Sequence, residues 1–345
     1  MTRRVKIGVI GCGAVARLHA EAIVSAENAA LAGFADVRRE SAEAFAKEFG
    51  GKAYASVADM LADKEIEGVC ICTPSGFHTG VALEALRAGK HILVEKPLAV
   101  TVSDCDEIIA LAKEKGAVAG VISQFRFTSS VQSLKRMLEA GRFGKLITGE
   151  LLMKYYRTQE YYDSSAWRGT WALDGGSMMN QGIHGVDALL YLLGPAESVC
   201  GYMDTKTHEM EAEDTSVAAV KFKSGPLVVI QSTTSAFKGS PRHISIVGTQ
   251  GSIVITEDSI EKCDINDTDF IPETTDIVES SAKNFGHTSP MSISSDGHKY
   301  QIRNFADAIL GRDAIAVPLA ESRRAVALIQ GVYESARTGK SVTFE

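Results

Sequence analysis

The fold is decided by residues 5–16, which read Val5-Lys6-Ile7-Gly8-Val9-Ile10-Gly11-Cys12-Gly13-Ala14-Val15-Ala16. A short apolar run leads into the pattern G-x-G-x-x-A, and helical periodicity follows over residues 14–25. In this context the first Gly permits a tight turn and the second lets the backbone approach a pyrophosphate. The Ala allows close packing of the helix, whose N-terminus favours the anion. The stretch therefore predicts that residues 11–16 form a dinucleotide-binding turn.

The remainder of residues 1–125 repeats this alternation of apolar strands and helical patterns. Strands are predicted at residues 5–10, 29–35, 68–72, 91–94 and 117–122, with helices at 14–25, 41–49, 57–62, 79–88 and 103–115. Apolar strands that alternate with helices are typical of a parallel sheet covered on both faces. We therefore expect residues 1–125 to form an α/β Rossmann domain that binds NAD(P).

Asp36 ends the second predicted strand, 20 residues after Ala16. A carboxylate at this place suits the ribose hydroxyls of NAD and repels the 2′-phosphate of NADP. Arg38 and Arg39 follow closely and could soften that preference. We therefore expect NAD, with NADP less favoured, and we include Asp36 and Arg38 among the cofactor-binding residues.

Further candidates lie where the later strands end, because open α/β sheets bind ligands at the carboxyl ends of their strands. The third strand runs into a turn and the start of a helix, with Thr73, Pro74, Ser75 and His78 as candidate cofactor contacts. The fourth delivers Glu95-Lys96-Pro97, and Gln124 follows the fifth. Glu95, Lys96 and Gln124 complete the predicted cofactor site, and Lys96 is the first candidate for catalysis.

After residue 125 the pattern changes to strands that alternate apolar and polar residues. A helix at residues 131–140 precedes predicted strands at 146–154, 215–222, 227–233, 244–247 and 252–256. Helices at 300–310 and 321–338 and a strand at 341–344 close the chain, and residues 264–298 are expected to form a polar loop. Such strands predict a mostly antiparallel sheet with one free face. Residues 126–345 are therefore expected to form an α+β domain for substrate binding and oligomerisation.

Residues 155–171 contain four of the nine Tyr residues and both Trp residues. Aromatic rings offer a face to sugar C–H groups, and Arg binds hydroxyls or carboxylates. The stretch could instead pack on the sheet or on a partner subunit. The candidate substrate-binding residues of this domain are Arg126, Tyr156, Arg157, Trp167, Arg168 and Asn180.

A helix is expected to begin near Ser177, since apolar residues then recur at helical spacing. Asn180 and His184 are four apart and share a face. Asp187 could orient the imidazole of His184 or cap a neighbouring segment. A histidine presented in this way suits proton transfer near neutral pH, so His184 is the second catalytic candidate.

Composition excludes several other classes of function. The net charge of −7 and the absence of a basic run disfavour nucleic acid as a partner. No apolar run approaches the roughly 18 residues of a membrane helix, and residues 5–10 are too short for a signal peptide, so a cytoplasmic protein is expected. The six Cys residues lack paired zinc-site spacing and predict buried free thiols, with no metal site.

Taken in order, these motifs resemble the Gfo/Idh/MocA family of nicotinamide-dependent oxidoreductases. The resemblance rests on the Gly11-x-Gly13-x-x-Ala16 turn, Asp36, Thr73-Pro74 with His78, Glu95-Lys96-Pro97, and Gly175-Gly176 leading to His184-x-x-Asp187. It implies oxidation of a sugar or cyclitol hydroxyl or the reverse reduction, with Lys96 beside the reacting oxygen and His184 as general acid/base. It also implies a homodimer or homotetramer assembled through the second sheet.

One departure concerns Asn180, since several family members carry Asp there and Asn cannot take a proton. The string from Tyr156-Arg157 through Trp167-Arg168 to His184 resembles a branch that includes UDP-N-acetylglucosaminuronate 3-dehydrogenases and sugar 3-dehydrogenases. We thus expect hydride transfer at a secondary hydroxyl of a glycoside, sugar acid, nucleotide sugar or cyclitol, with the 3-position one possibility. The alternatives are an NADPH-dependent ketosugar reductase, an enzyme that uses NAD transiently for elimination or deglycosylation, and a non-catalytic dinucleotide sensor.

Overall fold

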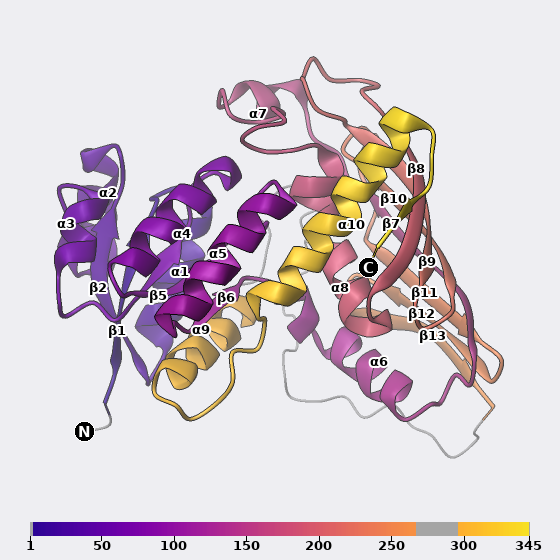
Figure 1. Ribbon diagram of the computed structural model, residues 1–345, viewed down its shortest axis with the longest axis horizontal. Coiled ribbons are helices and arrows are strands. Elements are labelled where there is room, and N and C mark those ends of the chain that lie inside the picture. The colour runs from indigo at the N-terminus through magenta and orange to yellow at the C-terminus, as the bar shows by residue number, and fades with distance from the viewer. Residues whose placement is uncertain (1–2, 267–295, 345) are drawn as a thin grey trace. The chain divides into compact units, whose positions relative to one another are not determined.

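The computed structural model describes residues 3–266 and 296–344 and divides the chain into two compact units (Figure 1). The first unit comprises residues 1–124 and 295–323, and the second comprises residues 125–294 and 324–345. Residues 295–323, which the predicted boundary assigns to the second domain, thus group with the first. The predicted loop at residues 264–298 lies largely outside the described residues. Its described margins belong instead to a strand that ends at Ile265 and a helix that begins at Asp296.

The first unit contains a parallel sheet of six strands in the order β3-β2-β1-β4-β5-β6. The strands are β1 (Val5–Ile10), β2 (Ala29–Ala35), β3 (Lys52–Ala53), β4 (Gly68–Ile71), β5 (His91–Val94) and β6 (Ala119–Val121). The helices are α1 (Ala14–Ser25), α2 (Arg39–Phe49), α3 (Val57–Ala62), α4 (His78–Arg87), α5 (Val102–Lys115) and α9 (Asp296–Ile309). The strand order reverses between β1 and β4, which is where Rossmann folds bind dinucleotides. This confirms the predicted α/β class.

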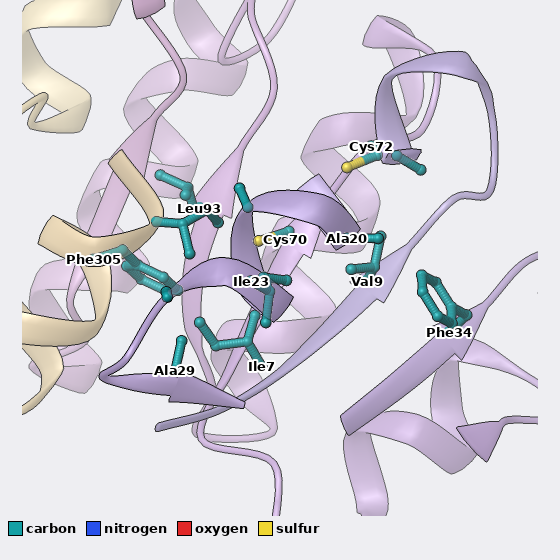
Figure 2. Close-up of a cluster of buried hydrophobic side chains, with 14 of the residues drawn as sticks. Ile7, Val9, Ala20, Ile23, Ala29, Phe34, Cys70, Cys72, Leu93 and Phe305 are labelled. Atoms are coloured by element: carbon teal, nitrogen blue, oxygen red, sulfur yellow. The ribbon is translucent and has the colours of Figure 1, made fainter. Parts of the chain in front are cut away.

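Helix α9 joins the first unit because its apolar side chains complete that unit's core. Phe305 is fully buried beside Ile7 and Leu93, and Figure 2 shows the ring among these side chains. A Cβ on Gly68 of β4 would lie 3.0 Å from the Phe305 ring. The core therefore needs a segment that lies more than 200 residues further along the sequence, which local periodicity does not reveal.

The second unit contains an eight-stranded sheet in the order β13-β12-β11-β7-β10-β9-β8-β14. The strands are β7 (Leu146–Lys154), β8 (Ala196–Asp204), β9 (Thr215–Phe222), β10 (Leu227–Thr233), β11 (His243–Gly248), β12 (Gly251–Thr256), β13 (Ser259–Ile265) and β14 (Val342–Thr343). The pair β7–β10 is parallel and the other neighbours are antiparallel. The predicted mostly antiparallel sheet is confirmed, although β8 and β13 are absent from the predicted strands.

The helices of the second unit include α6 (Ser129–Glu139), α7 (Gln159–Asp163) and α8 (Ile183–Leu193). The helix expected near Ser177 begins as a π-helical turn, η3 (Met178–Gly182), and becomes α-helical at Ile183. Helix α10 (Leu319–Thr338) spans the division between the units at Arg323. No helix in the described ranges is long and apolar enough to cross a membrane.

The thiol prediction is only partly correct. Cys12, Cys70, Cys72 and Cys105 are buried and free, as expected for small apolar side chains. Cys200 on β8 is exposed and Cys263 on β13 is half-buried, so the prediction is wrong for these two. Both lie on strands that the sequence pattern missed.

Candidate active site

The turn between β1 and α1 has the shape that its glycines predict. Gly11 adopts a φ of +91°, and a Cβ there would lie 2.8 Å from the backbone of Cys72. A Cβ on Gly13 would meet nothing within 4 Å, so this side of the turn is open. Gly13 is the N-cap of the 12-residue helix α1 and has no side chain with which to cap its amides. The open, uncapped N-terminus fits the pyrophosphate of a dinucleotide.

Asp36 lies directly beside this turn. Its Oδ2 accepts a hydrogen bond from the backbone N–H of Cys12 (2.7 Å), and its Oδ1 accepts one from the backbone N–H of Arg38 (2.8 Å). The Arg38 Nε lies 3.9 Å from Oδ1, while Arg39 pairs with Glu43. The two arginines thus have acidic partners of their own, and the carboxylate of Asp36 is held in a fixed place at the end of β2.

The segment after β4 joins the same edge of the sheet. The Thr73 hydroxyl is buried and has no hydrogen-bond partner among the described residues, as expected of a group that binds a ligand. The His78 ring lies between two carbonyl oxygens, with Nδ1 2.7 Å from that of Pro97 and Nε2 2.9 Å from that of Thr73. Burial lowers the pKa of His78, so the neutral ring donates to one carbonyl at a time. His78 therefore fastens the turn after β4 to the Lys96–Pro97 segment.

Glu95 anchors the backbone of Lys96. Its Oε2 accepts the Lys96 N–H at 3.2 Å, and its Oε1 lies 2.8 Å from His19 Nε2 and 3.4 Å from His298 Nε2. Burial alone would raise the pKa of Glu95, but hydrogen bonds from the two histidines hold it well below its usual range. Burial lowers the pKa of His19, so a neutral His19 donates Nε2–H to an ionised Glu95.

These three residues also present ligand atoms within 4.8 Å of one another. Metal-bound histidines usually donate their second ring N–H to a partner. Here Nδ1 of both His19 and His298 is buried without a hydrogen-bond partner among the described residues. The arrangement fits hydrogen bonding to Glu95 better than metal ligation, and we assign no metal to it.

In the second unit, Glu213 holds the start of the helix that carries His184. Its Oε1 accepts the backbone N–H of Met178 (2.8 Å) and the hydroxyl of Tyr333 (2.8 Å), and its Oε2 accepts the hydroxyl of Ser177 (2.6 Å). A Cβ on Gly176 would lie 2.4 Å from this carboxyl group, so the close approach requires glycine. Burial raises the pKa of Glu213 to about 7.

His184 lies in the first turn of α8 and is buried. Its ring packs on Phe125 with centroids 4.8 Å apart, and the Arg242 guanidinium lies 3.8 Å from the Phe125 ring centroid. Spacing leaves open whether Asp187, three residues later, orients this imidazole or caps a neighbouring segment. In the structure, Asp187 forms a buried bidentate ion pair with Arg126, both distances being 2.7 Å. Arg126, a predicted substrate contact, is 2% exposed, and this ion pair fastens η2 (Gln124–Phe127) to α8.

Asn180 belongs to a chain of side-chain hydrogen bonds. Its amide nitrogen donates to the carboxylate of Asp174, and its oxygen accepts from Gln181 Nε2 at 2.7 Å. The Gln181 Oε1 in turn accepts from Arg157 Nη2 at 3.0 Å. Asp174 also accepts the backbone N–H of Gly169 (2.8 Å), which ties the chain to the aromatic stretch. Asp174 and Gln181 are absent from the sequence prediction, although an acid before Gly175-Gly176 could have drawn attention.

The aromatic stretch forms a stack of rings and guanidinium groups. The Arg168 guanidinium lies 4.1 Å from the Tyr161 ring centroid and 4.5 Å from that of Trp167. The Arg157 guanidinium lies 5.6 Å from the Tyr161 centroid. Tyr156 turns elsewhere and packs edge-on against Phe237 at 5.7 Å. Arg157, Trp167 and Arg168 are thus brought together, whereas Tyr156 and Arg126 have other surroundings.

The loop before β9 holds the backbone of Arg157. His208 Nε2 lies 3.0 Å from the Arg157 carbonyl oxygen and Nδ1 lies 3.0 Å from Asp214 Oδ2. Burial lowers the pKa of His208, but the hydrogen bonds to Asp214 and to the carbonyl outweigh it, and the pKa is raised. Both ring nitrogens donate in the protonated form, which fixes the start of the aromatic stretch.

Within the first unit, the structure gathers the predicted cofactor residues at one sheet edge. These are the 11–16 turn, Asp36, Arg38, Thr73, Pro74, Ser75, His78, Glu95 and Lys96. Gln124, after β6, is buried, and its Oε1 has no hydrogen-bond partner among the described residues. The residues present fit NAD, since they combine an open helix N-terminus with a fixed carboxylate at the end of β2.

Comparison with known proteins agrees with this geometry. Residues 5–123 match an oxidoreductase family with an NAD-binding Rossmann fold, and residues 131–254 match the Gfo/Idh/MocA C-terminal domain. The solved WlbA dehydrogenase from Bordetella pertussis, in complex with NADH and UDP-GlcNAcA, is 30% identical, with 99% of each chain covered and a TM-score of 0.89.

Two curated relatives share shorter regions. Glucose-6-phosphate 3-dehydrogenase of Bacillus subtilis is 33% identical over 60% of this chain and 59% of its own. Myo-inositol 2-dehydrogenase of Thermotoga maritima is 28% identical over 72% of this chain and 74% of its own.

The fold and site define an NAD-binding oxidoreductase, which confirms the predicted enzyme class and cofactor. The chain belongs to the Gfo/Idh/MocA family.

Proposed function

We propose that this enzyme oxidises a secondary hydroxyl, with the 3-hydroxyl the first choice, of a sugar that carries an anionic group. The observation that carries the proposal is the likeness over 99% of the chain to a dehydrogenase solved with NADH and UDP-GlcNAcA. The cluster of Arg157, Arg168 and aromatic rings supports it, because guanidinium groups bind carboxylates and phosphates and rings pack on sugar C–H faces.

The first unit supplies the cofactor site in this proposal. The 11–16 turn would hold the pyrophosphate, and Asp36 would hold the adenosine ribose. When bound, NAD accepts a hydride at its nicotinamide ring. The buried Thr73 hydroxyl and the Gln124 amide oxygen are further polar contacts that the site can offer.

Lys96 and His184 would handle the proton and the charge on the reacting oxygen. Lys96 has its backbone fixed on both sides, by Glu95 through its N–H and by His78 through the following Pro97 carbonyl. Its ammonium would stabilise developing negative charge on the sugar oxygen. His184 would take up the hydroxyl proton, since imidazole accepts protons near neutral pH.

We also propose that the outer face of the second sheet joins copies of this chain. Large apolar side chains are exposed there on β8 and on β10, the strands on either side of β9, with exposures of 78% for Tyr202, 61% for Leu227 and 46% for Val229. A set of exposed apolar residues on a sheet face is typical of a protein–protein interface. Light scattering by the purified enzyme measures the number of copies.

The test is hydride transfer by the purified enzyme, followed by the absorbance of reduced nicotinamide, with UDP-GlcNAcA, glucose 6-phosphate and myo-inositol, each with NAD and with NADP. We expect turnover with NAD and an acidic sugar. Lys96→Ala and His184→Ala should each reduce kcat by about a hundredfold or more while NAD binding is retained. The matched control is Lys113→Ala on the outside of α5, which should behave as wild type.

Three results would contradict parts of this proposal. Full turnover in Lys96→Ala would remove Lys96 from the chemistry. Preference for myo-inositol over both acidic sugars would contradict the anionic substrate. Tightly retained NAD with no net reduction, although the sugar is altered, would instead favour transient oxidation during elimination or deglycosylation.

A further inference from the structure

The chain from Arg157 to Asp174 has a fixed direction. A guanidinium group only donates hydrogen bonds, and a carboxylate only accepts them. The Gln181 and Asn180 amides between them therefore turn their oxygens toward Arg157 and their nitrogens toward Asp174. Each link passes from a donor nitrogen to an acceptor oxygen, and a cation stands at one end and an anion at the other.

This polar chain connects the two parts of the proposed substrate site. Arg157 follows β7 at one end, and Asp174 accepts the Gly169 N–H beside Trp167 and Arg168 at the other. Asn180 and Gln181 lie on η3, the π-helical turn that continues directly into α8 with His184. Asp174 is only 2% exposed, so its charge is little screened by water.

A second carboxylate has no place in this arrangement. An Asp at position 180 would put its side chain against Asp174, where the Asn180 amide now donates. Asp174 is buried and position 180 is half-buried, so two carboxylates in contact there would repel each other and the pKa of one would rise.

We propose that Asp174 is a positioning residue of the substrate site, which holds Arg157 and the 167–171 stretch to the His184 helix through Asn180 and Gln181. The site requires one carboxylate, at position 174 or at position 180, and does not accept two. The effect on turnover rests on the proposed function, whereas the effect on folding does not.

The experiment compares Asp174→Asn, Asn180→Asp and the exchange variant Asp174→Asn/Asn180→Asp with wild type. The first readout is the midpoint of thermal unfolding between about pH 5 and pH 8, which needs no substrate. In Asn180→Asp the raised carboxyl pKa contributes stability only while the group is protonated, so stability should fall as pH rises through that pKa. The exchange variant holds one carboxylate and should regain the pH profile of wild type.

The second readout is kinetics with the sugar that the enzyme turns over. We expect Asp174→Asn and Asn180→Asp to raise KM by about tenfold or more with a smaller change in kcat and unchanged NAD affinity, because Arg157 and the aromatic stretch lose their alignment. The exchange variant should recover most of this loss. A merely structural role for Asp174 predicts no recovery.

Gln159→Glu is the matched control. The Gln159 amide donates a hydrogen bond to Asp163 at 2.9 Å, as Asn180 donates to Asp174, but the pair with Asp163 is exposed. A second carboxylate at position 159 should therefore leave the dependence of the unfolding midpoint on pH unchanged. The proposal is overturned if Asn180→Asp unfolds with the pH profile of wild type, or if the exchange variant is no better than Asn180→Asp. Failure of every sugar in the assay would remove the kinetic readout but leave the unfolding comparison intact.

Discussion

The carboxylate of Asp36 has two tasks at the end of β2. It receives the backbone amides of Cys12 and Arg38, and in the proposed function it also binds the adenosine ribose. The fixed negative charge disfavours a 2′-phosphate more than a ribose hydroxyl. We therefore expect the choice between NAD and NADP to depend on Asp36 more than on the neighbouring arginines.

We predict that Asp36→Ala weakens NAD by about tenfold or more, because each lost hydrogen bond to a charged group is worth about 1.5–3 kcal/mol. NADP should be affected less, since the substitution also removes a repulsion. Titration of the purified variant with both dinucleotides measures the ratio, and Glu43→Ala, which leaves Arg39 without its partner on α2, is the control. An unchanged NAD/NADP ratio would contradict this role of Asp36.

Glu95 is the buried charge on which the Lys96 backbone depends. It is 5% exposed and is contacted by two imidazoles and one backbone amide. We predict that Glu95→Gln lowers the free energy of unfolding by about 1–3 kcal/mol, because the amide keeps one acceptor oxygen but turns an NH2 group toward a buried donor that the carboxylate now accepts from. Denaturant unfolding measures the change. The control is Glu48→Gln in the exposed pair with Arg17, which should leave the free energy of unfolding nearly unchanged.

The same cluster predicts how stability depends on pH. Burial lowers the pKa of His19 below 6.5, so its contribution is present above pH 6.5 and is lost as pH falls toward the folded value. Because Glu213 acts in the opposite direction over this range, the test uses the Glu213→Gln background, which should lose stability on acidification. A stability of that variant that is flat from about pH 7 to pH 5 would contradict a neutral, buried His19.

At the scale of elements, the π-helical turn η3 is held at its start by Glu213. The carboxyl group receives the amide of Met178 and the hydroxyls of Ser177 and Tyr333. Burial raises its pKa to about 7, above the usual 4.5. Its pH-linked contribution to stability is thus full below pH 4.5 and is lost as pH rises through about 7.

We predict that Glu213→Gln reduces this loss of stability at higher pH, because the amide has the same shape as the carboxyl group but does not ionise. The unfolding midpoint of wild type should decline from about pH 6 to pH 8, while that of Glu213→Gln should decline less. The control is Glu211→Gln, which changes the neighbouring acid that receives the Trp171 amide. Equal slopes for wild type and Glu213→Gln would show that Glu213 is ionised throughout this range.

The elements of the first unit follow from the sequence because their signals are local. Strands β1, β2 and β5 are continuous or nearly continuous apolar runs, and helix α1 begins where the glycine turn predicts. By contrast, β8 lacks clear alternation of apolar and polar residues, and the two residues of β3 form a strand only by pairing with β2. Propensity carries little information about such strands.

The residues of the candidate site also fall into those that the sequence predicts and those that it does not. The glycine turn, Asp36, Lys96 and His184 stand out in sequence because each has a characteristic spacing from a strand or helix. Asp174 and Glu213 act through partners that the tertiary fold brings to them, so no spacing identifies them. Arg126 and Asp187 are the opposite case. Their positions in the sequence indicate site residues, and in the structure they form an ion pair with each other in the interior.

At the scale of the whole molecule, the proposed association of copies would use the outer face of the second sheet. Cys200 on β8 lies on this face, since the strand register places it beside Ala219, which lies beside Val229. Cys200 is exposed in the single chain. An interface on this face would cover its thiol, which makes Cys200 a reporter of assembly.

We predict that the enzyme behaves as a multiple of its 36.9 kDa chain in light scattering, and that Cys200 then reacts slowly with a thiol reagent. Val229→Lys should yield single chains and fast labelling, because a desolvated lysine on an apolar interface is strongly unfavourable. Val37→Lys, at a 98% exposed valine in the first unit, is the control for an added charge. Adding Cys200→Ser to Val229→Lys should remove the fast reaction with the thiol reagent. Wild-type single chains, or oligomers in which Cys200 labels as fast as in Val229→Lys, would place any interface on another face.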